Sequence, residues 1–160
     1  MSNEHILIVE DTALVMVLLR SRLTADGYEV TGAGKVAEAL HAMRTRMPDL
    51  VVLDLTLFDD DPTGLTDGFA VLSLLRLRYP EADTAVIIYS ANTKPAVETR
   101  AKAMGVFAVI DKNDGVVPLL TAIRAALDER KARQAALPAP PAPPAPPVLS
   151  PLSSLKLVTS

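Results

Sequence analysis

The sequence predicts an α/β fold in which helices cover both faces of a doubly wound parallel sheet. Apolar runs rich in Val, Ile and Leu alternate with helical patterns along residues 1–136, the order that builds βαβ units. Three of these runs are almost continuously apolar, as expected for strands that are buried on both faces. Five such units predict a (βα)5 sandwich with a five-stranded parallel sheet.

The expected elements follow one another regularly along the chain. The five strands are apolar, β-rich runs at residues 5–10, 28–33, 49–55, 85–91 and 106–112. The five helices are predicted at residues 12–25, 35–46, 67–78, 94–103 and 116–134. Gly27, Pro48, Pro80 and Gly105 follow the first four helices and act as stop signals. In doubly wound folds ligands bind beyond the carboxyl ends of the strands, so we expect a site at that edge.

Composition excludes several classes of function. The chain has 160 residues, of which 49% are hydrophobic and 22% charged, the balance of a soluble globular protein. A net charge of −3 argues against a nucleic-acid partner, which would require a basic surface. The chain contains no cysteine, which excludes disulfides and cysteine-ligated metals. No signal peptide and no membrane-spanning run is recognisable, so we expect a cytoplasmic protein without a membrane partner.

The composition changes near residue 137. Residues 137–160 hold eight of the thirteen prolines and a single charged residue, Lys156. Such a segment lacks the backbone donors needed for regular helix or sheet and favours extended conformations. We therefore expect one folded domain over residues 1–136 and a disordered proline-rich tail or linker over 137–160. A proline-rich docking peptide is the alternative interpretation of this tail.

Polar side chains gather where four of the predicted strands end. They are Glu10 and Asp11 at the end of the first strand, Asp54 at the end of the third, Ser90 beside the small Ala91 at the end of the fourth, and Lys112 at the end of the fifth. Three carboxylates at ~4–6 Å from one another repel unless a cation compensates them, and Mg²⁺ prefers such oxygen ligands together with water and phosphate oxygens. An acceptor carboxylate, a metal, an ammonium group and a hydroxyl together suit the binding of a phosphoryl group.

At this point the chain resembles the receiver domains of two-component response regulators, over about residues 3–130. The segments that carry the resemblance are ILIVEDTALVMVLLRSRL, GYEVTGAGKVAEAL, PDLVVLDLTL, VIIYSA and AMGVFAVIDK. The resemblance implies the flavodoxin-like strand order 2-1-3-4-5. It also implies a signalling module that assists its own phosphorylation and dephosphorylation, rather than an enzyme acting on other substrates.

The resemblance assigns roles to individual residues. Asp54 resembles the phosphorylated aspartate, and Glu10 and Asp11 resemble the acidic pair that binds Mg²⁺ together with Asp54. The backbone carbonyl of Thr56 would complete the protein ligands of the metal. Ser90, beside the small Ala91, resembles the switch hydroxyl, and Lys112 the lysine that pairs with the phosphoryl group. The implied phosphodonor is a histidine kinase, a histidine phosphotransfer protein or a small acyl phosphate.

Three features depart from the family pattern. The acid–glycine pair that opens the third helix stands thirteen residues after Asp54, which enlarges the loop 57–67. The acids 59-DDD-61 of this loop (Asp59, Asp60 and Asp61) form either a solvated turn or a lid beside the site. Val109 occupies the position where the family commonly has Tyr or Phe, so we expect an altered switch. Asn113 follows Lys112 in place of proline, and we predict a trans peptide bond there because a cis non-proline bond costs ~2.5–4 kcal/mol.

The sequence shows no second folded domain after residue 136. We therefore expect either a stand-alone receiver that relays its signal by contacts with another protein, or a piece of a longer protein. The identity of the downstream protein is open, and a homodimer is compatible with the resemblance. The alternative function is a phosphorylation-independent adaptor, which the changes at Val109 and Asn113 favour. An aspartate-dependent phosphohydrolase is disfavoured, because it typically uses Asp-x-Asp, whereas Thr56 stands at the second position.

Overall fold

The computed structural model describes residues 3–57 and 68–137 of the chain. The strands, in chain order, are β1 (His5–Val9), β2 (Glu29–Ala33), β3 (Leu50–Leu53), β4 (Ala85–Ser90) and β5 (Ala108–Asp111). The helices are α1 (Ala13–Ala25), α2 (Val36–Thr45), α3 (Gly68–Arg78), α4 (Pro95–Ala103), the single 3₁₀ turn η1 (Lys112–Asp114) and α5 (Val117–Ala136). Each expected element is present, with ends that differ by a few residues from the predicted ones.

All five strands pair in parallel, in the order β2-β1-β3-β4-β5. The predicted order is therefore confirmed. The chain first places β2 beside β1 and then returns to place β3 on the other side of β1, so the order reverses between β1 and β3. The carboxyl ends of these two neighbouring strands are where a doubly wound sheet offers its site.

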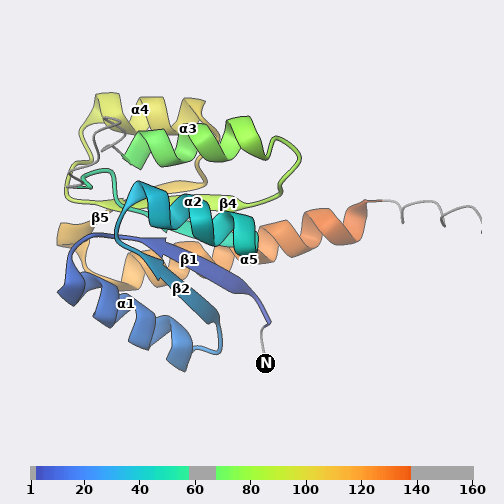
Figure 1. The fold of residues 1–160 in the computed structure, drawn as a ribbon, viewed down its shortest axis with the longest axis horizontal. Coiled ribbons are helices and arrows are strands. Elements are labelled where there is room, and N and C mark those ends of the chain that lie inside the picture. The colour runs from blue at the N-terminus through green and yellow to red at the C-terminus, as the bar shows by residue number, and fades with distance from the viewer. Residues whose placement is uncertain (1–2, 58–67, 138–160) are drawn as a thin grey trace, which may run out of the picture.

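Two hydrophobic cores fill the spaces between the sheet and its helices. Successive strand residues face opposite sides of the sheet, so Leu7 and Val9 of β1 belong to the core under α2, α3 and α4. Ile6 and Ile8 belong to the core under α1 and α5. Figure 1 shows α3 and α4 on one side of the sheet and α1 and α5 on the other. Each fully buried Leu or Ile contributes roughly 1.5–3 kcal/mol relative to an exposed one, which fixes the register of the central strands.

The described part of the chain contains no helix with the length and hydrophobicity that crossing a membrane demands. It also contains no cis peptide bond, so the trans bond predicted between Lys112 and Asn113 is confirmed. The acids Asp59 to Asp61, expected to form either a solvated turn or a lid, lie outside the described residues, as does the predicted tail beyond Leu137.

Candidate functional site

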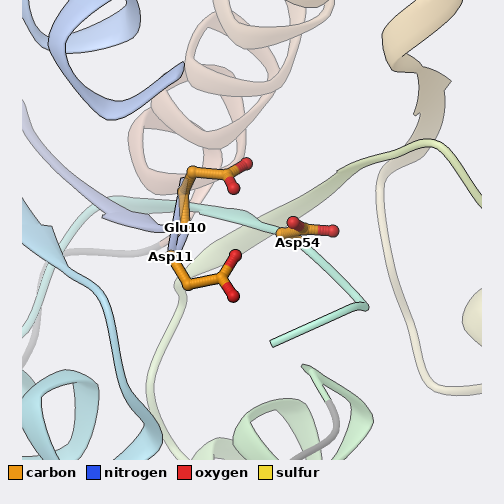
Figure 2. A group of neighbouring side chains, drawn as sticks. All are labelled: Glu10, Asp11 and Asp54. Atoms are coloured by element: carbon orange, nitrogen blue, oxygen red, sulfur yellow. The ribbon is translucent and has the colours of Figure 1, made fainter. Parts of the chain in front are cut away.

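Three carboxylates meet at the carboxyl ends of β1 and β3. Glu10 and Asp11 follow β1 directly, and Asp54 follows β3, whose backbone is held to β1 by a hydrogen bond from the Asp54 amide to the Val9 carbonyl of 2.9 Å. One carboxylate oxygen of each residue lies within 4.8 Å of the others. Figure 2 shows Glu10 and Asp11 reaching toward the side on which Asp54 lies. The structure thus brings together the three acids that the sequence predicted to converge.

Lys112 reaches this cluster from the edge strand β5 of the sheet. It is the first residue of η1, directly after β5. Its ammonium nitrogen lies 2.6 Å from Glu10 Oε2 and 3.0 Å from Asp54 Oδ2. One ammonium group therefore bridges two buried carboxylates and compensates part of their negative charge.

Backbone amides hold two of the acids in place. The amide of Thr12 donates to Glu10 Oε1 at 3.1 Å, and the amide of Thr56 donates to Asp54 Oδ1 at 3.1 Å. Because Lys112 binds the second oxygen of each carboxylate, both oxygens of Glu10 and of Asp54 have a partner. This fixes the plane of the Asp54 carboxylate, which is what a positioned nucleophile needs.

Burial and charge control protonation in this cluster. The side chains of Glu10 and Asp54 are only 2% and 5% exposed. Burial, the largest effect, raises the pKa of Glu10; the hydrogen bond from Lys112 opposes it and the charge of Asp54 adds to it. For Lys112, burial acts to lower the pKa, but the bonds to Glu10 and Asp54 outweigh it and raise the pKa above its ordinary value. Burial thus decides the direction for Glu10, whereas the two neighbouring carboxylates decide it for Lys112.

Ser90 lies at the end of β4, next to β3, and its side chain is completely buried. Its hydroxyl oxygen accepts a hydrogen bond from the Asn92 amide at 3.2 Å. Ala91, which follows it, is exposed. The Ser90 hydroxyl is therefore at the end of the strand adjacent to β3, which Asp54 follows.

Val109 is half-buried and packs against the core beneath α2, α3 and α4. It provides no ring at the place where the resemblance implies an aromatic. The nearby aromatic residue of the same strand segment, Phe107, is 38% exposed. The altered switch at this position stays a prediction from the sequence.

Gly68 is a residue of the site whose importance the sequence did not reveal. It opens α3 and its amide donates to the Leu55 carbonyl at 3.1 Å. A β-carbon at this position would lie 2.2 Å from the Asp54 carbonyl oxygen and 2.7 Å from the α-carbon of Leu55. Only glycine permits so close an approach of two backbone segments. The acid–glycine pair was a visible signal, but only the fold shows that Asp54 lies against it.

A groove of about 700 Å³ lies elsewhere, between β2 and α2, and includes His5, Glu29 and Arg46 in its lining. None of the acids of the cluster lines it. This groove is therefore separate from the candidate site at the strand ends.

Comparison with known proteins identifies the family. The response regulator receiver domain family matches residues 6–124. Among curated relatives, the KDP operon transcriptional regulatory protein KdpE of Escherichia coli K12 is 32% identical over 131 residues, which cover 82% of this chain and 54% of that protein. The transcriptional regulatory protein KdpE of Mycobacterium tuberculosis H37Rv is 34% identical over 129 residues, covering 79% and 52%. The chain thus spans about half the length of these curated relatives.

Solved structures agree with this match. The signal receiver domain of a putative LuxO repressor protein from Vibrio parahaemolyticus has a TM-score of 0.74 at 21% identity, covering 84% of this chain and 97% of that one, and supports the fold. NtrX from Brucella abortus has a TM-score of 0.73 at 26% identity, covering 84% and 29%. With the strand order, the acidic cluster and the family match in agreement, this chain belongs to the response regulator receiver domain family.

Proposed function

We propose that Asp54 is the phosphoryl acceptor of a two-component phosphorelay. The observation that carries the proposal is the bridging contact of Lys112 with Glu10 and Asp54, because it places a cation, a fixed carboxylate and a second acid at one point. The described residues offer no other cluster of three or more acids or histidines with this proximity. The receiver unit that we propose comprises residues 1–136, and its role is signalling rather than turnover of a substrate.

The chemistry of the cluster fits Mg²⁺. Hard oxygen ligands are those that Mg²⁺ prefers, with one or two carboxylates and several waters, and three acids against one ammonium leave a net negative charge. Glu10, Asp11, Asp54 and the backbone carbonyl of Thr56 are the groups proposed to hold the ion. When bound, the ion neutralises charge on the phosphoryl oxygens during transfer.

Phosphoryl transfer then uses groups that the fold has already positioned. A carboxylate oxygen of Asp54 forms a bond to phosphorus while the bond from phosphorus to the donor's imidazole nitrogen breaks, and the imidazole keeps the electron pair and takes up a proton. The bond from the Thr56 amide holds the acceptor carboxylate in a single orientation. The Lys112 ammonium and the Ser90 hydroxyl are proposed to bind the transferred group, whose charge of about −2 they complement.

The proposed phosphodonor protein is a histidine kinase or a histidine phosphotransfer protein of the cytoplasm. The face of α1 offers it an apolar surface, defined by Leu14, Val17 and Leu18, which are 68%, 63% and 61% exposed. These residues stand at positions i, i+3 and i+4 and share one side of the helix. Because α1 begins two residues after Asp11, this surface adjoins the acidic cluster, where a donor must place its phosphohistidine.

We propose that the output is a contact with a downstream protein whose identity is open. The phosphorylation-independent adaptor remains the second candidate, and the observation that favours it is the aliphatic Val109 in the place of a switch aromatic. The two candidates differ in whether Asp54 reacts.

The test is the intact mass after incubation with acetyl phosphate and Mg²⁺. We expect a labile single-phosphoryl adduct that is absent in Asp54→Asn and in the presence of EDTA. Asp128→Asn, which replaces an exposed acid on α5, is the matched control and should retain the adduct. If neither an adduct nor binding of beryllofluoride is found in the wild type, the phosphoacceptor proposal fails and the adaptor function replaces it.

A further inference from the structure

Asp111 directly precedes Lys112 in the chain, and each of its carboxylate oxygens binds a different segment. It is the last residue of β5, and its side chain is on the sheet face of Val109, two residues earlier. Asp111 Oδ2 accepts a hydrogen bond from the Thr93 hydroxyl at 2.9 Å. Asp111 Oδ1 accepts one from the Asn113 amide at 2.8 Å.

The first segment is the loop between β4 and α4. It begins directly after Ser90, which is the strand partner of Asp111 in the register of β4 and β5. The Asn92 amide binds the Ser90 hydroxyl, and Thr93, the next residue, binds Asp111. Two successive residues therefore hold this loop in place: Asn92 binds the Ser90 hydroxyl, and Thr93 binds Asp111 on the neighbouring strand.

The second segment is the turn that carries Lys112. Asp111 is the N-cap of η1, and its bond to the Asn113 amide closes a short ring around the Lys112 backbone. Asn113 supplies an N–H here that a proline would lack. Asn113, which stands where the family usually has proline, thus donates its amide N–H to the Asp111 carboxylate.

The two bonds also favour the ionised form of Asp111. The Asn113 amide, followed by the Thr93 hydroxyl, lowers the pKa of Asp111 below its ordinary value. Hydrogen bonds to an ionised acceptor are stronger than those between neutral groups. The link between the two segments is therefore made by a charged group at neutral pH.

We propose that Asp111 is a positioning residue that ties the loop after Ser90 to the turn carrying Lys112, so that both phosphoryl-binding groups are held as one unit. This inference rests on the proposed phosphoacceptor function. It gives the chain a polar coupling between β4 and β5 in the region where Val109 offers no aromatic ring. Preorganised groups bind a ligand with less loss of conformational freedom, so breaking the tie weakens phosphoryl binding.

The test uses Thr93→Val, which removes the hydroxyl but keeps the shape of the side chain, and measures the Kd of beryllofluoride, a phosphoryl mimic, in saturating Mg²⁺. We expect a two- to tenfold weaker Kd, the range of one net hydrogen bond. Thr93→Ser restores the hydroxyl and should restore the Kd. Thr99→Val is the matched control, because the Thr99 hydroxyl donates to the Pro95 carbonyl at 2.9 Å within α4.

Asp111→Ala, which loses both bonds, should weaken the Kd at least as much as Thr93→Val. Adding beryllofluoride should shift the Asn113 amide resonance by a different amount in Thr93→Val than in the wild type, and by the same amount in Thr99→Val. If the hydrogen bond between Thr93 and Asp111 only stabilised the fold, the two variants would not differ in this way. Equal Kd values for Thr93→Val, Thr99→Val and the wild type overturn the inference, even if Thr93→Val unfolds at a lower temperature. Loss of beryllofluoride binding in the wild type itself contradicts the proposed function, so the two failures are distinguishable.

Discussion

Replacing Asp11 by Asn removes one of three negative charges at the site while keeping the size of the side chain. Most substitutions destabilise a protein, but here we expect the opposite in the absence of divalent cations. The acids of the cluster repel one another, and the Lys112 ammonium contacts Glu10 and Asp54. Loss of the Asp11 charge relieves repulsion with Glu10 and with Asp54.

The magnitude follows from the separation of the charges. Two unit charges 4.8 Å apart, the limit for these oxygens, interact by about 3.5 kcal/mol at an effective dielectric constant of ~20 and by about 0.9 kcal/mol in bulk water. Asp11 is half-buried, which places its environment between these limits. We therefore expect Asp11→Asn to raise the free energy of unfolding by about 1–2 kcal/mol, a shift in Tm of several degrees.

The assay is urea unfolding followed by circular dichroism, in EDTA and in Mg²⁺. Mg²⁺ should stabilise the wild type by about 2.7 kcal/mol at a concentration one hundred times its Kd, and should have little effect on Asp11→Asn, which lacks one of the proposed ligands. Asp128→Asn controls for the loss of an exposed acid. Lys112→Met should act in the opposite direction and destabilise the protein without metal, because two buried acids lose their counter-ion. A wild type that is more stable than Asp11→Asn in EDTA would refute the reasoning.

Two further predictions concern positions outside the charge cluster. Gly68→Ala should lower the free energy of unfolding in urea by about 3 kcal/mol and impair phosphorylation, because its β-carbon would collide with the Asp54 carbonyl. Gly34→Ala, where the nearest atom would be 3.8 Å away, should leave the free energy of unfolding nearly unchanged. Equal losses of stability in the two variants would contradict this reasoning. His5 is buried, and burial lowers its pKa below 6.5, so the unfolded state binds more protons and stability should fall as the pH drops below 6.5. His5→Gln should reduce this loss between pH 7.5 and 5.5 in urea unfolding, whereas the exposed His41→Gln should not; an unchanged loss in His5→Gln would argue against a neutral His5.

Part of the fold and of the site was predictable because the signals are local in the sequence. The apolar run before Asp54 and the runs of β1 and β4 have the composition of buried parallel strands. The end of such a strand is where a doubly wound sheet exposes polar side chains. The sequence therefore sufficed to predict that Glu10, Asp54 and Lys112 converge.

Other features were not predictable because they depend on which segments lie beside one another. Nothing near Gly68 in the sequence indicates that its backbone lies against the Asp54 carbonyl. Asp111 was expected only as part of a strand, and its two hydrogen bonds join a loop eighteen residues earlier to the turn that follows it.

The sequence by itself determined the fold class of this protein, the order of its helices and strands, and the chemical types of the residues at the strand ends. Hydrophobic periodicity and the chemical type of each residue are properties of the chain alone. The tertiary structure alone decided the contacts within the site: that Lys112 bridges Glu10 and Asp54, that Gly68 lies against Asp54, and that Asp111 joins the loop after Ser90 to the turn η1. The physical reason is that hydrogen bonds and steric limits act over a few ångströms, and only folding brings residues from distant parts of the chain to that distance.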